Sequence, residues 1–134
     1  ACFEDYTGNF ADPSDYHLGN PYSGCDGGNG MVITSVTPST NIKQNDEIEV
    51  NGSGFGTSEL TVIYYGNNSN LGGSVVPTSD SYIKMSYNNT VLNAETIQMK
   101  VINVKLDYTS SIPLWDQVKT ATKWSNCHSI SVIP

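Results

Sequence analysis

The sequence predicts an all-β protein in which a β-sandwich follows an extended N-terminal arm. The first observation is the composition of the 134 residues, which is rich in Ser, Thr, Asn and Gly and contains 37% hydrophobic and 14% charged residues. This balance is typical of an exported β-protein rather than a helical cytosolic one. The second observation is a series of short hydrophobic runs after residue 30, separated by turn-forming residues at roughly the spacing found in sandwiches.

Residues 1–30 form the predicted arm, and residues 31–134 form the predicted sandwich. The arm holds five acidic residues and no Lys. We expect its aromatic side chains to anchor it on a neighbouring surface; they are Phe3, Tyr6, Phe10, Tyr16 and Tyr22. Asp12, Asp15 and Asp26 could offer oxygen ligands to Ca²⁺, but their spacing matches no EF-hand loop. A solvated acidic arm is therefore the favoured interpretation.

Seven or eight short strands are predicted within the sandwich. They cover residues 31–36, 47–52, 60–66, 74–76, 82–87, 96–106, 117–124 and 128–133. The clearest signal is the alternation around Ile48 and Val50, which places two hydrophobic side chains on one face of a strand. The run NNSNLGG at 67–73 is predicted to be a turn. For residues 113–121, one or two turns of helix are the alternative to a strand.

One stretch of the sandwich resembles a known family. Residues 33–67 are similar to the first half of an IPT/TIG domain, an immunoglobulin-like module of cell-surface receptors, adhesins and some carbohydrate-active enzymes. The matching positions are Ile33, Val36, Pro38, Ile48, Val50, Gly52, Gly54, Phe55, Val62 and Gly66. The run DYTSSIPLWD departs from the glycine-containing turn usual in the family, and residues 1–30 have no counterpart. The resemblance implies an immunoglobulin-like β-sandwich of about seven strands.

The stretch EVNGSGFGT at 49–57 places three glycines at alternating positions after a strand. A dinucleotide-binding loop requires G-x-G-x-x-G between a strand and a helix. Here the spacing is Gly52, Gly54 and Gly56, and another strand follows. We therefore interpret the glycines as a turn that uses positive φ angles, with Phe55 closing one end of the sandwich.

The three cysteines are Cys2, Cys25 and Cys127. In an immunoglobulin-like sandwich the first and last strands lie side by side, so a Cys25–Cys127 disulfide is topologically reasonable. It would close a loop of about 100 residues and stabilise the fold by roughly 4–5 kcal/mol in the entropic model. A Cys2–Cys25 disulfide remains the alternative. In the first case Cys2 is left as a free or intermolecular thiol.

Three N-glycosylation sequons begin at Asn51, Asn67 and Asn88. Together with the cysteines they favour an extracellular or cell-surface location. The chain has no Arg and a net charge of −7, which argues against nucleic-acid binding because such binding needs clustered basic residues. No hydrophobic run approaches the length of a membrane span.

We expect no catalytic residues, metal site or cofactor. The run WSNCH at 124–128 resembles a c-type haem attachment motif, but Trp124 stands where the first Cys is required. An ordinary strand start is therefore the favoured interpretation of Cys127 and His128. Two histidines and three scattered cysteines offer no zinc-ligand spacing, and no G-x-S-x-G elbow is present.

The leading functional hypothesis is a structural or adhesion subunit that acts through protein–protein contacts. The arm at residues 1–30 would reach onto another copy of the chain and build a filament or layer, for example by strand addition. The alternative is a carbohydrate-binding module of a secreted enzyme or adhesin, in which exposed aromatic side chains would stack on glycans.

Overall fold

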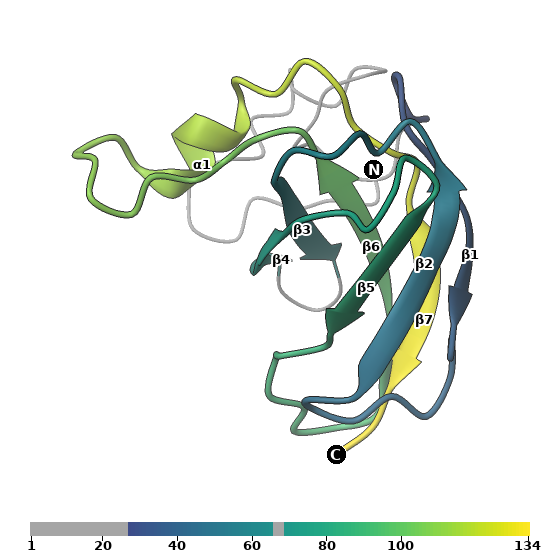
Figure 1. The fold of residues 1–134 in the computed structure, drawn as a ribbon. Helices are drawn as coiled ribbons and strands as arrows, with labels where there is room; N and C mark the ends of the chain where they lie inside the picture. The colour runs from purple at the N-terminus through teal and green to yellow at the C-terminus, as the bar shows by residue number, and fades with distance from the viewer. Residues whose placement is uncertain (1–26, 66–68) are drawn as a thin grey trace.

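The computed structural model describes residues 27–65 and 69–134, and these residues form an almost entirely β structure (Figure 1). Its elements in chain order are β1 (Val32–Thr37), β2 (Glu47–Ser53), β3 (Leu60–Tyr65), β4 (Ser69–Val75), β5 (Tyr82–Ser86), β6 (Glu95–Ile102), α1 (Leu114–Val118) and β7 (His128–Val132). The predicted all-β sandwich of about seven strands is confirmed. Most of the predicted arm, residues 1–26, lies outside the described residues.

The strands form two antiparallel sheets that face each other. One sheet has the order β1-β2-β5, and the other has the order β4-β3-β6-β7. The first, second and fifth strands thus share a sheet, as do the third, sixth and seventh, which is the division found in immunoglobulin-like sandwiches. The fourth strand pairs with β3 and widens the second sheet.

The core between the sheets is built from side chains that alternate along the strands. Ile48 and Val50 are fully buried on β2, while Glu47 and Glu49 point to solvent. Further large contributors come from β1, β3, β5, β6 and β7; they include Ile33, Val36, Val62, Tyr64, Ile83, Ile97, Met99, Val101, Ile130 and Val132. The alternation predicted for residues 47–52 is therefore confirmed.

A second hydrophobic cluster covers the opposite face of the four-stranded sheet. Ile63 and Tyr65 project to this face from β3, and Ile102 projects from β6. They pack with Val104, Leu106, Val118 and Ala121, which belong to the segment that follows β6 and to α1. Every residue of β3 is buried as a result.

Two local predictions are wrong. The predicted strand at 117–124 is replaced by α1 and the turns after it, so the alternative of one or two helical turns at 113–121 is the one confirmed. Val118 and Ala121 point together into the second cluster. That spacing of three residues places both side chains on one helical face.

The predicted turn at 67–73 contains most of β4, which pairs with β3 from Ser69 to Val75. The register shifts between Val62 and Ile63, so that Gly72 forms a bulge. A Cβ atom at Gly72 would lie 2.2 Å from the Tyr64 ring. These glycines therefore let an edge strand pass close to a core aromatic side chain, rather than ending the strand.

Candidate functional site

The loop after β2, which contains Gly54 and Gly56, binds a carboxylate of its own chain. Asp80 lies just before β5, and its two carboxylate oxygens accept hydrogen bonds from the backbone amides of Gly54 (3.2 Å) and Gly56 (2.9 Å). The amide of Phe55 donates to the backbone carbonyl of Asp80 at 3.0 Å. Successive amides that converge on one anion form an anion-binding nest. Here the anion is Asp80.

The glycines are required by this geometry. Gly54 and Gly56 have φ angles of 79° and 70°, in the left-handed region that favours glycine. A Cβ atom at Gly52 would lie 1.8 Å from the carbonyl oxygen of Val32. Phe55 is 3% exposed and belongs to the inner core. The interpretation as a turn with positive φ angles is confirmed for Gly54 and Gly56, and Phe55 is buried as expected. It is wrong for Gly52, which belongs to β2 and pairs with Ile33.

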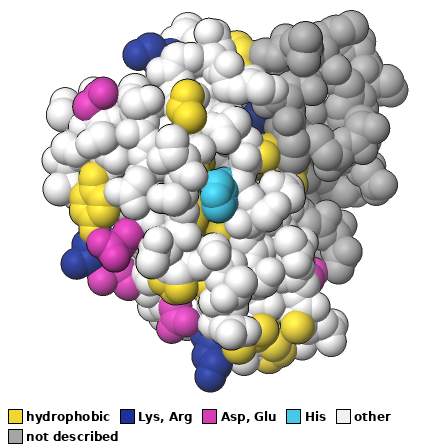
Figure 2. Space-filling view, turned by 90° about the vertical axis from the view of Figure 1, so that its right-hand side faces the viewer, with side chains coloured by type: hydrophobic (Ala, Val, Ile, Leu, Met, Phe, Trp, Pro, Cys, Tyr) yellow, Lys and Arg dark blue, Asp and Glu magenta, His cyan; other side chains and the backbone are white. Residues whose placement is uncertain are grey.

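One side of the sandwich, where β1 and β7 lie next to each other, is closed by hydrogen bonds. The amide of Ile33 donates to the Asn126 side chain at 2.7 Å, and that side chain donates back to the Ile33 carbonyl at 3.0 Å. Further along, the amide of Ile42 donates to the Ser131 carbonyl at 3.1 Å, and the amide of Ser131 donates to the Ser39 carbonyl at 2.8 Å. Figure 2 shows this side, whose surface is mostly uncharged and polar with scattered hydrophobic groups.

The other side of the sandwich, between β4 and β5, carries a groove of about 500 Å³. Its walls come from the edge strands of the two sheets. The apolar part of the lining is formed by Val62, Val75 and Met85, together with Val76, which is 59% exposed. Within the described part of the chain, no strand pairs with the outer edge of either β4 or β5.

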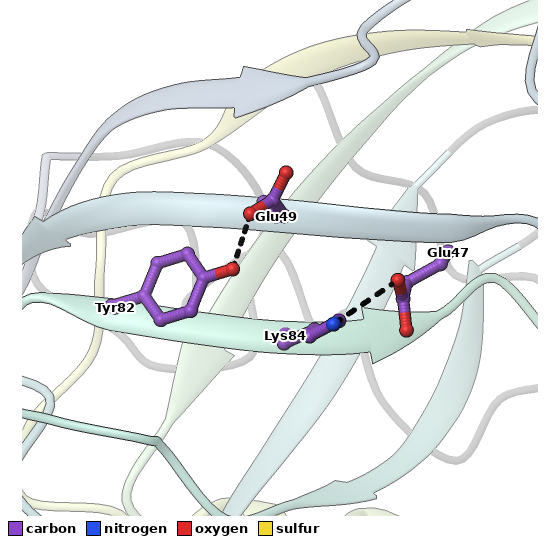
Figure 3. Close-up of polar contacts among 4 residues, drawn as sticks. All are labelled: Glu47, Glu49, Tyr82 and Lys84. Atoms are coloured by element: carbon purple, nitrogen blue, oxygen red, sulfur yellow. Dashed lines mark hydrogen bonds and ion pairs between the residues drawn. The ribbon is translucent and has the colours of Figure 1, made fainter.

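The solvent face of the three-stranded sheet is polar next to this groove (Figure 3). The Lys84 ammonium lies 3.4 Å from the Glu47 carboxylate, and the Tyr82 hydroxyl donates a hydrogen bond to Glu49. The hydrogen bond to Glu49 raises the pKa of Tyr82 above its ordinary value. Both pairs run diagonally between β2 and β5, so they stabilise the neighbouring strands as cross-strand pairs.

A projecting loop after β6 is held in shape by Gln117. The side chain of Gln117 accepts a hydrogen bond from the amide of Asp107 at 2.8 Å and donates to the carbonyls of Asp107 at 3.0 Å and Ile112 at 2.9 Å. Thr109 donates from its hydroxyl and its amide to the Asp107 carboxylate, which lowers the pKa of Asp107. The loop exposes 64% of Tyr108 and 55% of Ile112. No hydrophobic periodicity at residues 107–112 indicated an ordered loop here.

Two of the three predicted glycosylation sites lie on exposed surface. Asn51 is on β2, where its side chain donates a hydrogen bond of 3.4 Å to the Ser35 hydroxyl. Asn88 follows β5 and lines the groove. Asn67 lies outside the described residues.

Several predicted positions cannot be located in the sandwich. Cys2, Cys25 and the arm anchors Phe3, Tyr6, Phe10, Tyr16 and Tyr22 lie outside the described residues. The Cys25–Cys127 disulfide therefore stays a prediction. Cys127 itself is half-buried against the second hydrophobic cluster. Gly27, two residues after Cys25, accepts a hydrogen bond of 3.3 Å from the Trp124 indole, three residues before Cys127.

The residues of the WSNCH run have ordinary structural surroundings. Trp124 packs against the second cluster, and His128 is the first residue of β7, with its Nδ1 atom 3.0 Å from the Ser129 carbonyl. Across residues 27–65 and 69–134, no three His, Cys, Asp or Glu side chains converge in a way that could hold a metal ion. In the same ranges, no helix is long and apolar enough to cross a membrane.

Comparisons with known proteins identify no relative. No protein-family model matches the chain. A search of curated proteins also finds no match.

Proposed function

We propose that this chain is an extracellular or cell-surface structural subunit that joins copies of itself through its N-terminal arm, residues 1–30. The observation that carries this proposal is the unequal closure of the sandwich. On one side, Asn126 and the Ser39–Ile42 segment link β1 and β7 by hydrogen bonds, whereas β4 and β5 on the other side border a groove. An open edge of this kind is a template for strand addition.

The same proposal places the sandwich among IPT/TIG-like domains. Positions of the family pattern coincide with structural roles in this chain: Ile33, Val36 and Phe55 are buried in the inner core, and Gly54 adopts a positive φ angle. These roles support the resemblance because they explain why the pattern requires hydrophobic side chains and glycine at fixed positions.

An exported location is supported by the two described sequons. Asn51 and Asn88 are both exposed, so a glycan on either would lie outside the core. Asn88 also lines the groove, so strand addition there requires its sequon to be unoccupied. Their occupancy is testable as a mass increase of the native protein that is lost on treatment with an endoglycosidase.

The arm is tested by comparing the whole chain with two variants. One lacks residues 1–24, and the other keeps full length but replaces the five arm aromatics with Ser. We expect the unaltered chain to form larger assemblies as its concentration rises, and both variants to remain monomeric by light scattering and electron microscopy. Far-UV circular dichroism of each variant serves as the folding control. Normal assembly by folded variants would contradict the proposal.

A carbohydrate-binding module is the second candidate. The observation that favours it is the exposure of Tyr108 on a loop that Gln117 holds in shape, because a rigid exposed aromatic ring suits stacking on a sugar. Binding on a glycan array that disappears in Tyr108→Ala would support this function. An array without signal at high protein concentration would remove it.

A further inference from the structure

The four sheet edges of the sandwich differ in how well they are protected. The edges of β1 and β7 are joined through Asn126 and the Ser39–Ile42 segment. The edge of β5 carries Lys84, which is exposed, and a charged edge strand resists pairing with another chain. The sequence of β4, SNLGGSV, contains neither a charge nor a proline. Among the edges that the structure describes, β4 is therefore neither joined to another edge nor charged, and its only protecting feature is the bulge at Gly72.

The surroundings of β4 provide space for an added strand. The groove of about 500 Å³ begins at Gly72 and Gly73 and continues past Val75 and Val76 to Met85 on β5. Gly73 has no side chain to block an approaching backbone, and a Cβ atom there would have only the Asn88 amide nitrogen within 4 Å, at 3.7 Å. The apolar groups in the groove offer contacts for alternate side chains of an incoming strand.

We propose that the outer edge of β4 is the acceptor for a strand from residues 1–26 of a second copy of this chain. The inference rests on the proposed function and names its binding site. The segment of 26 residues before Gly27 could reach at most about 86 Å when fully extended. By comparison, β4 has seven residues and is roughly 24 Å long. The segment is therefore long enough to leave its own sandwich and still cover the whole of β4 in a neighbour.

The position of Gly27 favours a neighbour over the same chain as the source of the strand. Gly27 and Asn29 are hydrogen-bonded to Trp124, just before β7. In the sheet, β6 and β3 lie between β7 and β4. The donor segment thus leaves from the closed side of one molecule, while the acceptor lies on the open side. A contact between two different surfaces of the same chain is heterologous, and it generates either a closed ring or an open filament of subunits.

The acceptor is tested in the full-length chain by two pairs of matched variants. Val76→Lys places a charge in the groove, and Val32→Lys places the same charge on β1, where Val32 is 46% exposed. Ser74→Lys on β4 and Ser129→Lys on β7 form a second pair at exposed positions. We expect each β4-side variant to raise the concentration needed for assembly by about tenfold or more, because burying an unpaired charge is costly. The matched variants on the closed side, Val32→Lys and Ser129→Lys, should assemble at the same concentration as the unaltered chain.

Hydrogen exchange supplies a second measurement on the unaltered chain. The amides of residues 69–75 should gain protection as assemblies form, whereas those of β7 should not change. Protection of β4 that is already complete at concentrations where the chain is monomeric would show that its own arm occupies the edge, and would overturn the second-copy assignment.

The outcomes separate this inference from the proposed function. If the arm variants fail to assemble but Val76→Lys and Ser74→Lys assemble normally, the arm acts elsewhere and the β4 site is wrong. If the folded arm variants assemble normally, or if the unaltered chain never assembles, both proposals fail. If the arm variants and the β4-side variants lose assembly while the closed-side variants keep it, both proposals are supported.

Discussion

The two sheets of the sandwich meet solvent in different ways. The three-stranded sheet has one buried face, and its other face carries Glu47, Glu49, Tyr82 and Lys84 in cross-strand pairs. The four-stranded sheet is buried on both faces at β3, because a second cluster built around Ile63 covers its outer side. A strand buried on one face alternates in sequence, whereas a strand buried on both reads as a continuous hydrophobic run. The continuous run LTVIYY in β3 therefore indicates burial on both faces, as the second cluster produces.

The largest loss of stability that probes this difference is expected for Ile63→Ala. Ile63 is fully buried on the outer face of β3, so its truncation should lower the free energy of unfolding by about 3 kcal/mol. Urea unfolding followed by circular dichroism measures the change. Glu49→Ala is the matched control, since Glu49 occupies the outer face of the central strand in the other sheet. It removes only the exposed pair with Tyr82 and should lower the free energy of unfolding by less than about 1 kcal/mol. Equal midpoints for both variants would show that the outer cluster is not a second core.

A smaller loss of stability is expected from a change at the loop between β2 and β3, where the chain crosses from one sheet to the other. Asp80→Ala removes the acceptor for the amides of Gly54 and Gly56, and should cost about 1 kcal/mol because the site is open to solvent. Asp80→Asn keeps one carbonyl oxygen and should lose less. Hydrogen exchange of residues 54–56 should quicken in the Ala variant. Unchanged exchange would indicate that the carboxylate does not hold the loop.

The smallest effect concerns Tyr64, a core side chain of β3. Its hydroxyl is buried, and no hydrogen-bond partner for it occurs among the residues that the structure describes. Tyr64→Phe should therefore raise the free energy of unfolding, by up to about 1 kcal/mol. Thermal unfolding at neutral pH measures the gain. A clear loss of stability would mean that the hydroxyl has a stabilising contact after all.

The same residue gives a pH dependence with a defined sign. Burial raises the pKa of Tyr64 above its ordinary value, and the nearby Tyr87 adds to the shift. The folded state therefore keeps the hydroxyl protonated more firmly than the unfolded state, which ionises near pH 10. The protein should lose stability as the pH rises above about 10. Tyr64→Phe should reduce this slope without removing it, since burial also raises the pKa of Tyr87.

Much of the sandwich could be predicted from local patterns. The alternation of hydrophobic and polar residues predicted the position of β2, and short hydrophobic runs predicted the positions of β3 and β7. The spacing of Ile33 and Val36 looks irregular for a strand, since residues three apart normally point to opposite faces. The register of β1 shifts between Ile33 and Ser35, and this bulge brings both side chains into the core. The spacing of hydrophobic residues at 33 and 36 therefore reflects a bulge in this chain.

The rest depends on tertiary contacts that local patterns do not contain. Asn and Gly in β4 favour a turn in isolation, but pairing with β3 and the close approach of Gly72 to Tyr64 make the segment a strand. Helix α1 forms where Val118 and Ala121 meet the outer face of the sheet. The groove lies where β4 and β5 face each other, and the closed side lies where β1 and β7 do. These strands are far apart in the sequence, so no single stretch indicates that they are neighbours.

The carboxylate of Asp80 has a consequence for anions in solution. A ligand carried on the same chain, 24 to 26 residues from the amides that bind it, acts at an effective concentration of about a millimolar or more. Free phosphate or a nucleotide would have to compete with this resident carboxylate for the same amides. The amides of the loop that most resembles a phosphate-binding motif are thus already occupied by a carboxylate of the same chain. The amides of this loop bind Asp80 and so hold the connection between β2 and β3 against the residues that precede β5.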